Sequence, residues 1–159
     1  MSTGEGPCAQ HRAAAPAAVR CAVVTVSDTR TLPTDRGGQE LVELLTAAHH
    51  PVVDRQIVPD DPSRIQDAVT VLARRDDVQA VLLTGGTGIS PRDQTYEAVS
   101  ALLDRALPGY GELFRLLSYQ EIGPAAMLSR TVAGLIGRTI VLTMPGSPSG
   151  GRRFISIGS

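Results

Sequence analysis

Residues 78–95 read VQAVLLTGGTGISPRDQT, an apolar run that ends in a loop rich in glycine and hydroxyl side chains. The part VQAVLLT (78–84) is typical of a buried β-strand, because its apolar residues are nearly continuous and include β-branched types. Strands of a parallel sheet are covered on both faces, so they need no alternation of apolar and polar residues. This stretch therefore predicts one strand–loop–helix unit of an α/β domain with a mainly parallel sheet.

The same order recurs along most of the chain. Apolar runs predict further strands at 20–27, 51–59, 130–136 and 139–144, and helical spacing predicts helices at 38–50, 62–75, 96–107 and 110–123, with a short helix or turn at 123–129. Asp61 and Pro62 favour the start of the second helix, since aspartate is a good N-cap and proline suits the first turn. A chain of 159 residues with this alternation fits one domain.

The two ends of the chain differ from this middle part. Residues 1–19 are rich in alanine and proline and are expected to be a disordered tail. The folded domain is expected to cover residues 20–148. The last residues, SGGRRFISIGS (149–159), show little helical spacing and include two glycines near their start, so an irregular C-terminal tail is expected.

Composition excludes several classes of function. A net charge of −1 offers no basic excess for nucleic acid, and the chain has no apolar run long enough to span a membrane. All 15 basic residues are arginines, which excludes a lysine-dependent phosphate loop or Schiff base. The start of the chain does not resemble a secretory signal, so a cytoplasmic protein is expected. Cys8 and Cys21 are expected to be free thiols, because their spacing matches no metal or redox motif.

Parallel topology predicts where a ligand binds, because the carboxyl ends of the strands meet at one edge of the sheet. The glycines after residue 84 allow close approach of the backbone, and N–H groups, hydroxyls and a guanidinium suit a phosphate. The residues expected to bind the ligand at this edge are Thr84, Gly85, Gly86, Thr87, Gly88, Ser90 and Arg92, with Pro145, Gly146 and Ser147 after the last strand.

Asp93 does not suit a phosphate by itself, because like charges repel. One interpretation is that Asp93 or Thr95 caps the following helix. The other is that Asp93 holds a divalent cation that bridges to the phosphate. Asp60, at the preceding strand end, is either a solvated loop acid or a second acid of the same site. The residues alone thus indicate an α/β domain that binds a phosphorylated small molecule, with Mg²⁺ as the expected cation.

The order of several motifs is more specific than any one of them. These are SDT (27–29), VPDD (58–61), TGGTGISPRDQTYEA (84–98), LPGYGELFR (107–115) and AAMLSRTVAGLIGRTIVLTMPGSP (125–148). In this order they resemble the MoaB/Mog family of molybdenum-cofactor biosynthesis, which includes the pterin-binding domain of gephyrin. The resemblance covers about residues 20–148.

This resemblance implies a three-layer α/β fold, usually trimeric, that binds molybdopterin. Members of the Mog type adenylylate molybdopterin with MgATP and release pyrophosphate, and a downstream molybdenum-insertion protein is an expected partner. The family's two functional aspartates fall on Asp60 and Asp93, which would act in catalysis and hold Mg²⁺. The positions that line or support the pocket in the family are matched by Glu112, Arg115, Ser129 and Arg130.

Two alternatives to the adenylyltransferase remain. One is a MoaB-type paralogue that binds the pterin without turning it over. The other is a pterin carbinolamine dehydratase, which is disfavoured because His49 and His50 do not form the histidine cluster it would need. The family also continues after PGSP with an apolar helix, and the tail at 149–159 leads us to expect that this helix is missing.

Overall fold

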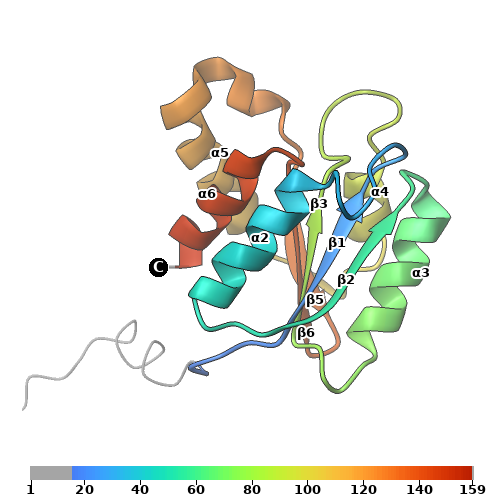
Figure 1. The fold of residues 1–159 in the computed structure, drawn as a ribbon. Coiled ribbons are helices and arrows are strands. Elements are labelled where there is room, and N and C mark those ends of the chain that lie inside the picture. Colours follow the sequence, from blue (N-terminus) through green and yellow to red (C-terminus); the bar gives the residue numbers. More distant parts are fainter. Residues whose placement is uncertain (1–15, 159) are drawn as a thin grey trace, which may run out of the picture.

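The computed structural model describes residues 16–158 and the side chains of residues 16–155. Within these residues the chain forms a six-stranded sheet with helices on both faces (Figure 1). The strands are β1 (Cys21–Val26), β2 (Val52–Val58), β3 (Ala80–Thr84), β4 (Arg105–Ala106), β5 (Ala133–Ile136) and β6 (Thr139–Met144). The helices are α2 (Arg36–Ala47), α3 (Pro62–Ala73), α4 (Thr95–Ser100), α5 (Pro108–Ile122), the 3-10 helix η1 (Gly123–Leu128) and α6 (Pro148–Gly158).

Four neighbouring strands of the sheet are parallel. The order is β2-β1-β3-β6-β5-β4; β1 pairs with β2 and β3, and β3 pairs with β6, all in parallel. The register places Val26 beside Val58, and Thr84 beside both Thr25 and Met144. The carboxyl ends of these strands therefore lie at one edge, which confirms the predicted α/β class.

Alternate side chains of the central strands face two helical layers, which gives the three-layer arrangement in Figure 1. On one face, Val24 and Val81 belong to a buried cluster with residues of α3 and α4. On the other face, Val23 and Leu82 pack with residues of α2 and α5, including Phe114. Since each fully buried apolar side chain of this size contributes about 1.5–3 kcal/mol, the two clusters hold the layers together.

The helix expected at 96–107 is wrong in its second half. α4 ends at Ser100, and Arg105–Ala106 form β4, which pairs antiparallel with β5. The Asp104 N–H donates to the Leu135 carbonyl (2.8 Å) just before the strand begins. Apolar spacing in so short a segment fits either state, and the free edge of β5 supplies hydrogen-bond partners that settle it as a strand.

The expectation of an irregular tail at 149–159 without a final helix is also wrong, because α6 occupies Pro148–Gly158. Arg153 is only 5% exposed and pairs with Glu121 of α5 through Nη2 and Oε2 (2.6 Å). Phe154 packs against the cluster shared by α2 and α5, and Gly151 is buried close to α2. Apolar spacing missed the helix because glycine and a paired arginine take up part of its buried face.

The remaining expectations about the ends concern residues near the N-terminus. Most of the predicted tail at 1–19 lies outside the described residues, so its disorder stays a prediction. Just before β1, the Val19 N–H donates to His50 Nδ1 (3.1 Å). Among residues 16–158, no helix combines the length and apolar character needed to cross a lipid bilayer.

Candidate functional site

The predicted site residues at the strand ends lie on connected backbone segments. The Ser27 N–H donates to the Val58 carbonyl (2.9 Å), and the Gly85 N–H donates to the Met144 carbonyl (3.0 Å). The segments after β1, β2, β3 and β6 are thus held side by side at the carboxyl edge of the sheet. This is the arrangement that the parallel topology predicted.

The loop after β3 depends on two glycines with left-handed backbone conformations. Gly85 has φ 103° and Gly86 has φ 66°. A Cβ at Gly85 would lie 2.4 Å from the Val26 carbonyl oxygen, and a Cβ at Gly86 would lie 2.3 Å from Thr95 Oγ1. The buried Thr95 hydroxyl in turn donates to the Gly85 carbonyl (2.8 Å). The loop is therefore pressed between β1 and the start of α4, where larger residues do not fit.

Four successive N–H groups of this loop have no acceptor. Among the hydrogen bonds of residues 16–158, none is donated by the backbone of Gly86, Thr87, Gly88 or Ile89. Backbone N–H groups are strong donors, and neighbouring unpaired ones suit an anionic ligand. The geometry therefore fits the predicted phosphate-binding role of the loop.

Asp60 lies half-buried beside this loop. Its Oδ1 accepts a hydrogen bond from the Gln94 N–H at the start of α4 (3.1 Å). Burial raises the pKa of the Asp60 carboxyl, the Gln94 N–H opposes that rise, and the negative charges of Asp93 and Asp28 add to it. The part of the rise in pKa that comes from the charges of Asp93 and Asp28 is the part that a nearby cation would relieve.

Asp93 does not cap α4, so the capping interpretation of Asp93 and Thr95 is wrong. The N-cap residue is Gln94, whose side chain makes no capping bond, and Thr95 is already helical. Asp93 Oδ2 instead accepts the Ser90 N–H within the loop (2.9 Å), and a Cβ at Gly88 would lie 2.7 Å from the same oxygen. Asp93 therefore closes the loop on itself and keeps its carboxylate at the glycine-rich segment.

Arg92 was expected to bind the ligand, but the structure places its guanidinium on a third acid, Asp28. Asp28 follows β1, and its other oxygen accepts the Asp60 N–H (2.9 Å). The Asp60 N–H, and then the Arg92 side chain, hold the pKa of the Asp28 carboxyl below its usual value. Asp28 directly follows the strand expected at 20–27, but nothing in the sequence indicated these two contacts.

The segment after β6 contacts the glycine loop directly. The Thr84 hydroxyl donates to the Pro145 carbonyl (3.2 Å), and a Cβ at Gly146 would lie 3.3 Å from Gly85 Cα. Arg30 Nη1 donates to the Gly146 carbonyl (3.3 Å). Pro145, Gly146 and Ser147 are therefore brought to the predicted site, as one wall of the loop.

Glu112 and Ser129 line a separate cavity of about 540 Å³ between α4, α5 and β5. The buried hydroxyls of Ser129 and Thr131 have no hydrogen-bond partner among the described residues. Buried polar atoms without a partner are costly, so their presence at a cavity points to a polar ligand group.

Arg130 joins this cavity to the glycine loop. Its N–H donates to the Thr87 carbonyl (2.8 Å), its Nε to the Gly88 carbonyl (2.7 Å) and its Nη2 to the Asp93 carbonyl (2.9 Å). The guanidinium carbon also lies 5.4 Å from the centre of the Tyr96 ring. Glu112 and Ser129 are therefore neighbours of the loop through Arg130, although they do not touch the two aspartates.

A family model described as "Probable molybdopterin binding domain" matches residues 22–156. The chain belongs to this molybdopterin-binding family. The match extends through most of α6, in agreement with the corrected C-terminus.

Individual members of the family are similar over most of the chain. Molybdenum cofactor biosynthesis protein B of Bacillus cereus is 55% identical over 139 residues, which are 87% of this chain and 82% of the relative. The protein of the same name from Escherichia coli is 44% identical over 128 residues, 80% of this chain and 75% of the relative. A solved structure, the molybdopterin biosynthesis Mog protein from Mycobacterium ulcerans, has a TM-score of 0.80 at 28% identity, with 87% of this chain and 91% of that chain covered.

Asp60 and Asp93 can supply only part of the ligand set of a bound cation. Among residues 16–158, no group of three or more histidine, cysteine or acidic side chains is arranged to hold a metal ion. Asp60 and Asp93 nevertheless present carboxylates on either side of the loop, and hard cations such as Mg²⁺ prefer oxygen ligands. The two carboxylates therefore fit Mg²⁺ as part of its oxygen ligand set.

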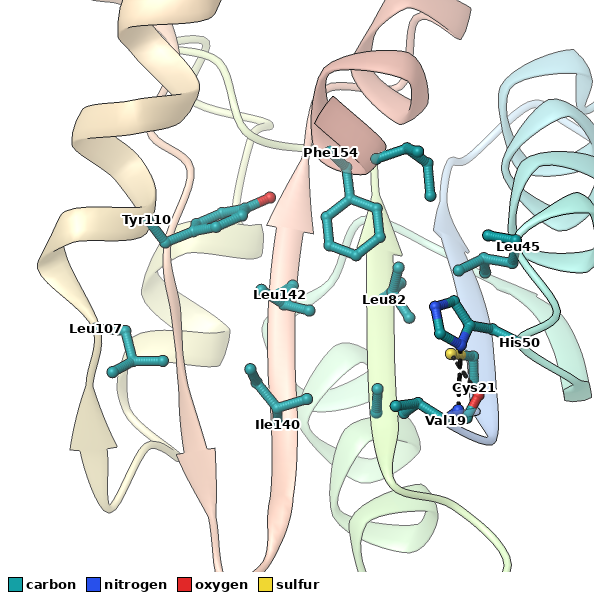
Figure 2. Close-up of a pocket in the computed structure, with 13 residues that line it drawn as sticks. Val19, Cys21, Leu45, His50, Leu82, Leu107, Tyr110, Ile140, Leu142 and Phe154 are labelled. Atoms are coloured by element: carbon teal, nitrogen blue, oxygen red, sulfur yellow. Dashed lines mark hydrogen bonds between the residues drawn. The ribbon is translucent and has the colours of Figure 1, made fainter. Parts of the chain in front are cut away.

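A further cavity of about 490 Å³ in this structure is lined by none of the predicted site residues. Figure 2 shows it against the face of β1, β3 and β6, with Leu45, Tyr110 and Phe154 around it. The Cys21 thiol lies beside it, and burial raises the pKa of that thiol to about 11. The lining is almost wholly apolar, so this cavity offers little to an anionic pterin or nucleotide.

Proposed function

We propose that this protein acts in molybdenum cofactor biosynthesis, where it binds molybdopterin and adenylylates it with MgATP. The observation that supports this most strongly is the carboxyl edge of the sheet. Unpaired N–H groups of Gly86, Thr87 and Gly88 lie between two acids. Asp60 is half-buried and accepts the Gln94 N–H, and Asp93 accepts the Ser90 N–H within the loop. Donors for an anion beside acids for a cation are the combination that a metal–nucleotide substrate needs.

The chemistry follows from charge and position. The terminal phosphate of molybdopterin attacks the α-phosphate of ATP, a new P–O–P link forms, and pyrophosphate leaves. The loop N–H groups hold one phosphate in place, and Arg130 fixes the loop backbone from the adjoining cavity. Asp60 and Asp93 would hold a Mg²⁺ ion that accompanies the nucleotide, and the ion would supply neutralisation of phosphate charge. Such a transfer requires positioning and charge neutralisation more than covalent catalysis by the protein.

The adjoining cavity is assigned to the pterin part of the substrate. Its volume of about 540 Å³ falls in the usual range of small-molecule sites. The unpaired hydroxyls of Ser129 and Thr131, with Glu112 nearby, offer donors and acceptors to a polar heterocycle. The substrate would then extend past Arg130 from this cavity to the glycine loop.

A second candidate is a MoaB-type protein that binds molybdopterin without adenylylating it. The chain is 55% identical to molybdenum cofactor biosynthesis protein B of Bacillus cereus and 28% identical to the Mog protein of Mycobacterium ulcerans, which favours this alternative. The pair Asp60 and Asp93 favours the enzyme, because a pterin-binding protein has no evident need of two acids beside a phosphate loop.

One incubation separates the two candidates. The protein is mixed with molybdopterin, ATP and Mg²⁺, and adenylylated pterin and pyrophosphate are measured over time. Product in stoichiometric excess over protein supports the enzyme. Saturable pterin binding with no product supports the second candidate.

The proposal includes a homotrimer in the cytoplasm that passes its product to a downstream molybdenum-insertion protein. α5, its N-cap residue and η1 carry a group of apolar side chains that are more than 40% exposed: Leu107, Leu113, Leu116, Tyr119, Ile122, Met127 and Leu128. Exposed apolar residues concentrated on neighbouring elements are typical of protein interfaces. We assign this apolar patch to the contact between subunits.

A further inference from the structure

The segments that follow β1, β2 and β3 are tied into a closed ring. Asp28 Oδ1 accepts the Asp60 N–H (2.9 Å), and Asp60 Oδ1 accepts the Gln94 N–H (3.1 Å). Gln94 is two residues from Arg92, whose guanidinium returns to Asp28 Oδ2. Asp28 is the member of the ring that uses both carboxylate oxygens within it.

Within this ring of Asp28, Asp60, Gln94 and Arg92, the Arg92 guanidinium neutralises Asp28. The Arg92 side chain is 76% exposed and is within reach of solvent, yet its salt bridge is with Asp28. Among residues 16–158, neither Asp60 nor Asp93 forms a salt bridge with an arginine. The two acids at the glycine loop thus keep their charge available for a cation, because Asp28 engages the nearby guanidinium.

We propose that Asp28 is a positioning residue of this site, which fixes the backbone of Asp60 and holds Arg92 away from the acids that face the ligand. This inference rests on the function proposed above. Asp28 makes no contact with the reacting groups in this role. Its effect is exerted through one backbone N–H and one guanidinium.

The two contacts can be separated by substitution. Asp28→Ala removes both, whereas Asp28→Asn keeps an oxygen for the Asp60 N–H and loses the charge that attracts Arg92. Asp104→Ala is the matched control, because Asp104 Oδ2 likewise accepts a backbone N–H, from Gly137 (2.7 Å), away from the site.

The first readout is amide hydrogen exchange, which requires no substrate. Exchange at the Asp60 amide should rise about tenfold or more in Asp28→Ala and stay near the wild-type rate in Asp28→Asn. Protection of a core amide such as Val23 should not change in either variant or in Asp104→Ala. An unchanged Asp60 amide in Asp28→Ala overturns the positioning role.

The second readout is the cation, measured as binding of Mn²⁺ in the presence of ATP. In Asp28→Asn the released Arg92 competes for Asp60 and Asp93, so Mn²⁺ affinity should fall about 10-fold. The double variant Asp28→Asn with Arg92→Gln should recover the wild-type affinity. Equal Mn²⁺ affinity in the wild type and Asp28→Asn overturns this half of the proposal.

Turnover is the third readout. The kcat of adenylylation should fall about 10–100-fold in Asp28→Ala, with most of the loss restored by Asp28→Asn at saturating Mg²⁺. A wild-type protein that forms no product contradicts the proposed function alone. In that case the exchange and Mn²⁺ measurements still decide the role of Asp28.

Discussion

The carboxylate of Asp60 accepts the backbone N–H of Gln94 at 3.1 Å, across 34 residues of sequence. An acid that follows β2 therefore accepts the N–H of the N-cap residue of α4, a task that a residue of the helix itself usually performs. The same side chain faces Asp93, and burial together with that charge raises its pKa. Asp60 thus supports the segment that follows the glycine loop, and ionisation of its carboxyl is unfavourable in the fold.

The raised pKa of Asp60 predicts that Asp60→Asn stabilises the protein at neutral pH. The carboxyl pKa in the fold is raised above its ordinary value of 3.8, so the folded state binds the proton more tightly than the unfolded state. The contribution of Asp60 to the free energy of unfolding is therefore fully present below pH 3.8, the ordinary pKa, and is lost as the pH rises through the raised pKa of the folded state. The melting temperature of Asp60→Asn should exceed that of the wild type by about 2 °C at pH 7, with the difference shrinking toward pH 4.

Thermal unfolding from pH 4 to pH 8 checks this, with Asp61→Asn as the opposite case. The Ser63 hydroxyl and the Arg64 N–H lower the pKa of the Asp61 carboxyl, so its loss should destabilise the protein at pH 7. An Asp60→Asn protein that melts below the wild type at pH 7 contradicts the electrostatic argument.

Asp93→Asn should abolish turnover far more than it weakens pterin binding. An amide oxygen can still accept the Ser90 N–H, so the loop keeps its shape, but the negative charge offered to the cation is gone. Pyrophosphate release should fall by about a hundredfold or more. Asp104→Asn, just before the edge strand β4, serves as the control, and unimpaired turnover by Asp93→Asn would falsify the assignment of Asp93.

Gly85→Ala should destabilise the fold by about 1–3 kcal/mol, because a Cβ is strained in this conformation and meets the Val26 carbonyl. The backbone has φ 103° there, and the Cβ would lie 2.4 Å from that oxygen. Urea unfolding measures the loss. Gly109→Ala is the matched control, since a Cβ at Gly109 meets nothing within 4 Å, and it should be neutral or stabilising. Equal midpoints for the two variants contradict the role given to Gly85.

Leu116→Glu should convert the proposed trimer into monomers while the fold is kept. Leu116 is 57% exposed within the apolar patch on α5 and η1, so a charge there costs little in the monomer and much in a buried interface. Light scattering gives the mass, and circular dichroism checks the fold. Val71→Glu, at a site 64% exposed on α3, should stay trimeric. A monomeric wild type contradicts the assembly outright.

The sequence predicted the parts of this molecule that repeat a local rule. The run at 80–84 is a strand because its residues are buried on both faces, and Asp61 caps α3 by accepting the Arg64 N–H (3.1 Å). Prediction from the sequence failed where a contact with a residue distant in the chain decides the secondary structure. α6 was missed because its packing uses glycine and the ion pair of Arg153 with Glu121.

The candidate site divides in the same way. Parallel topology alone placed the glycine loop, Asp60 and the segment after β6 together at one edge. The topology could not indicate that Asp60 accepts the Gln94 N–H, that Asp93 accepts the Ser90 N–H, or that Arg92 pairs with Asp28. Each of these contacts depends on side-chain rotamers that only the assembled sheet determines.

The ring at Asp28 has a consequence for the kinetics of folding. Its contacts join positions 32 and 64 residues apart, so none can close until β1, β2 and β3 are aligned. Non-local contacts of this kind form late, because the chain must first lose the entropy of closing the intervening loops. During refolding, binding competence should therefore appear together with the last cooperative step, and helical content that arises earlier should bring none of it.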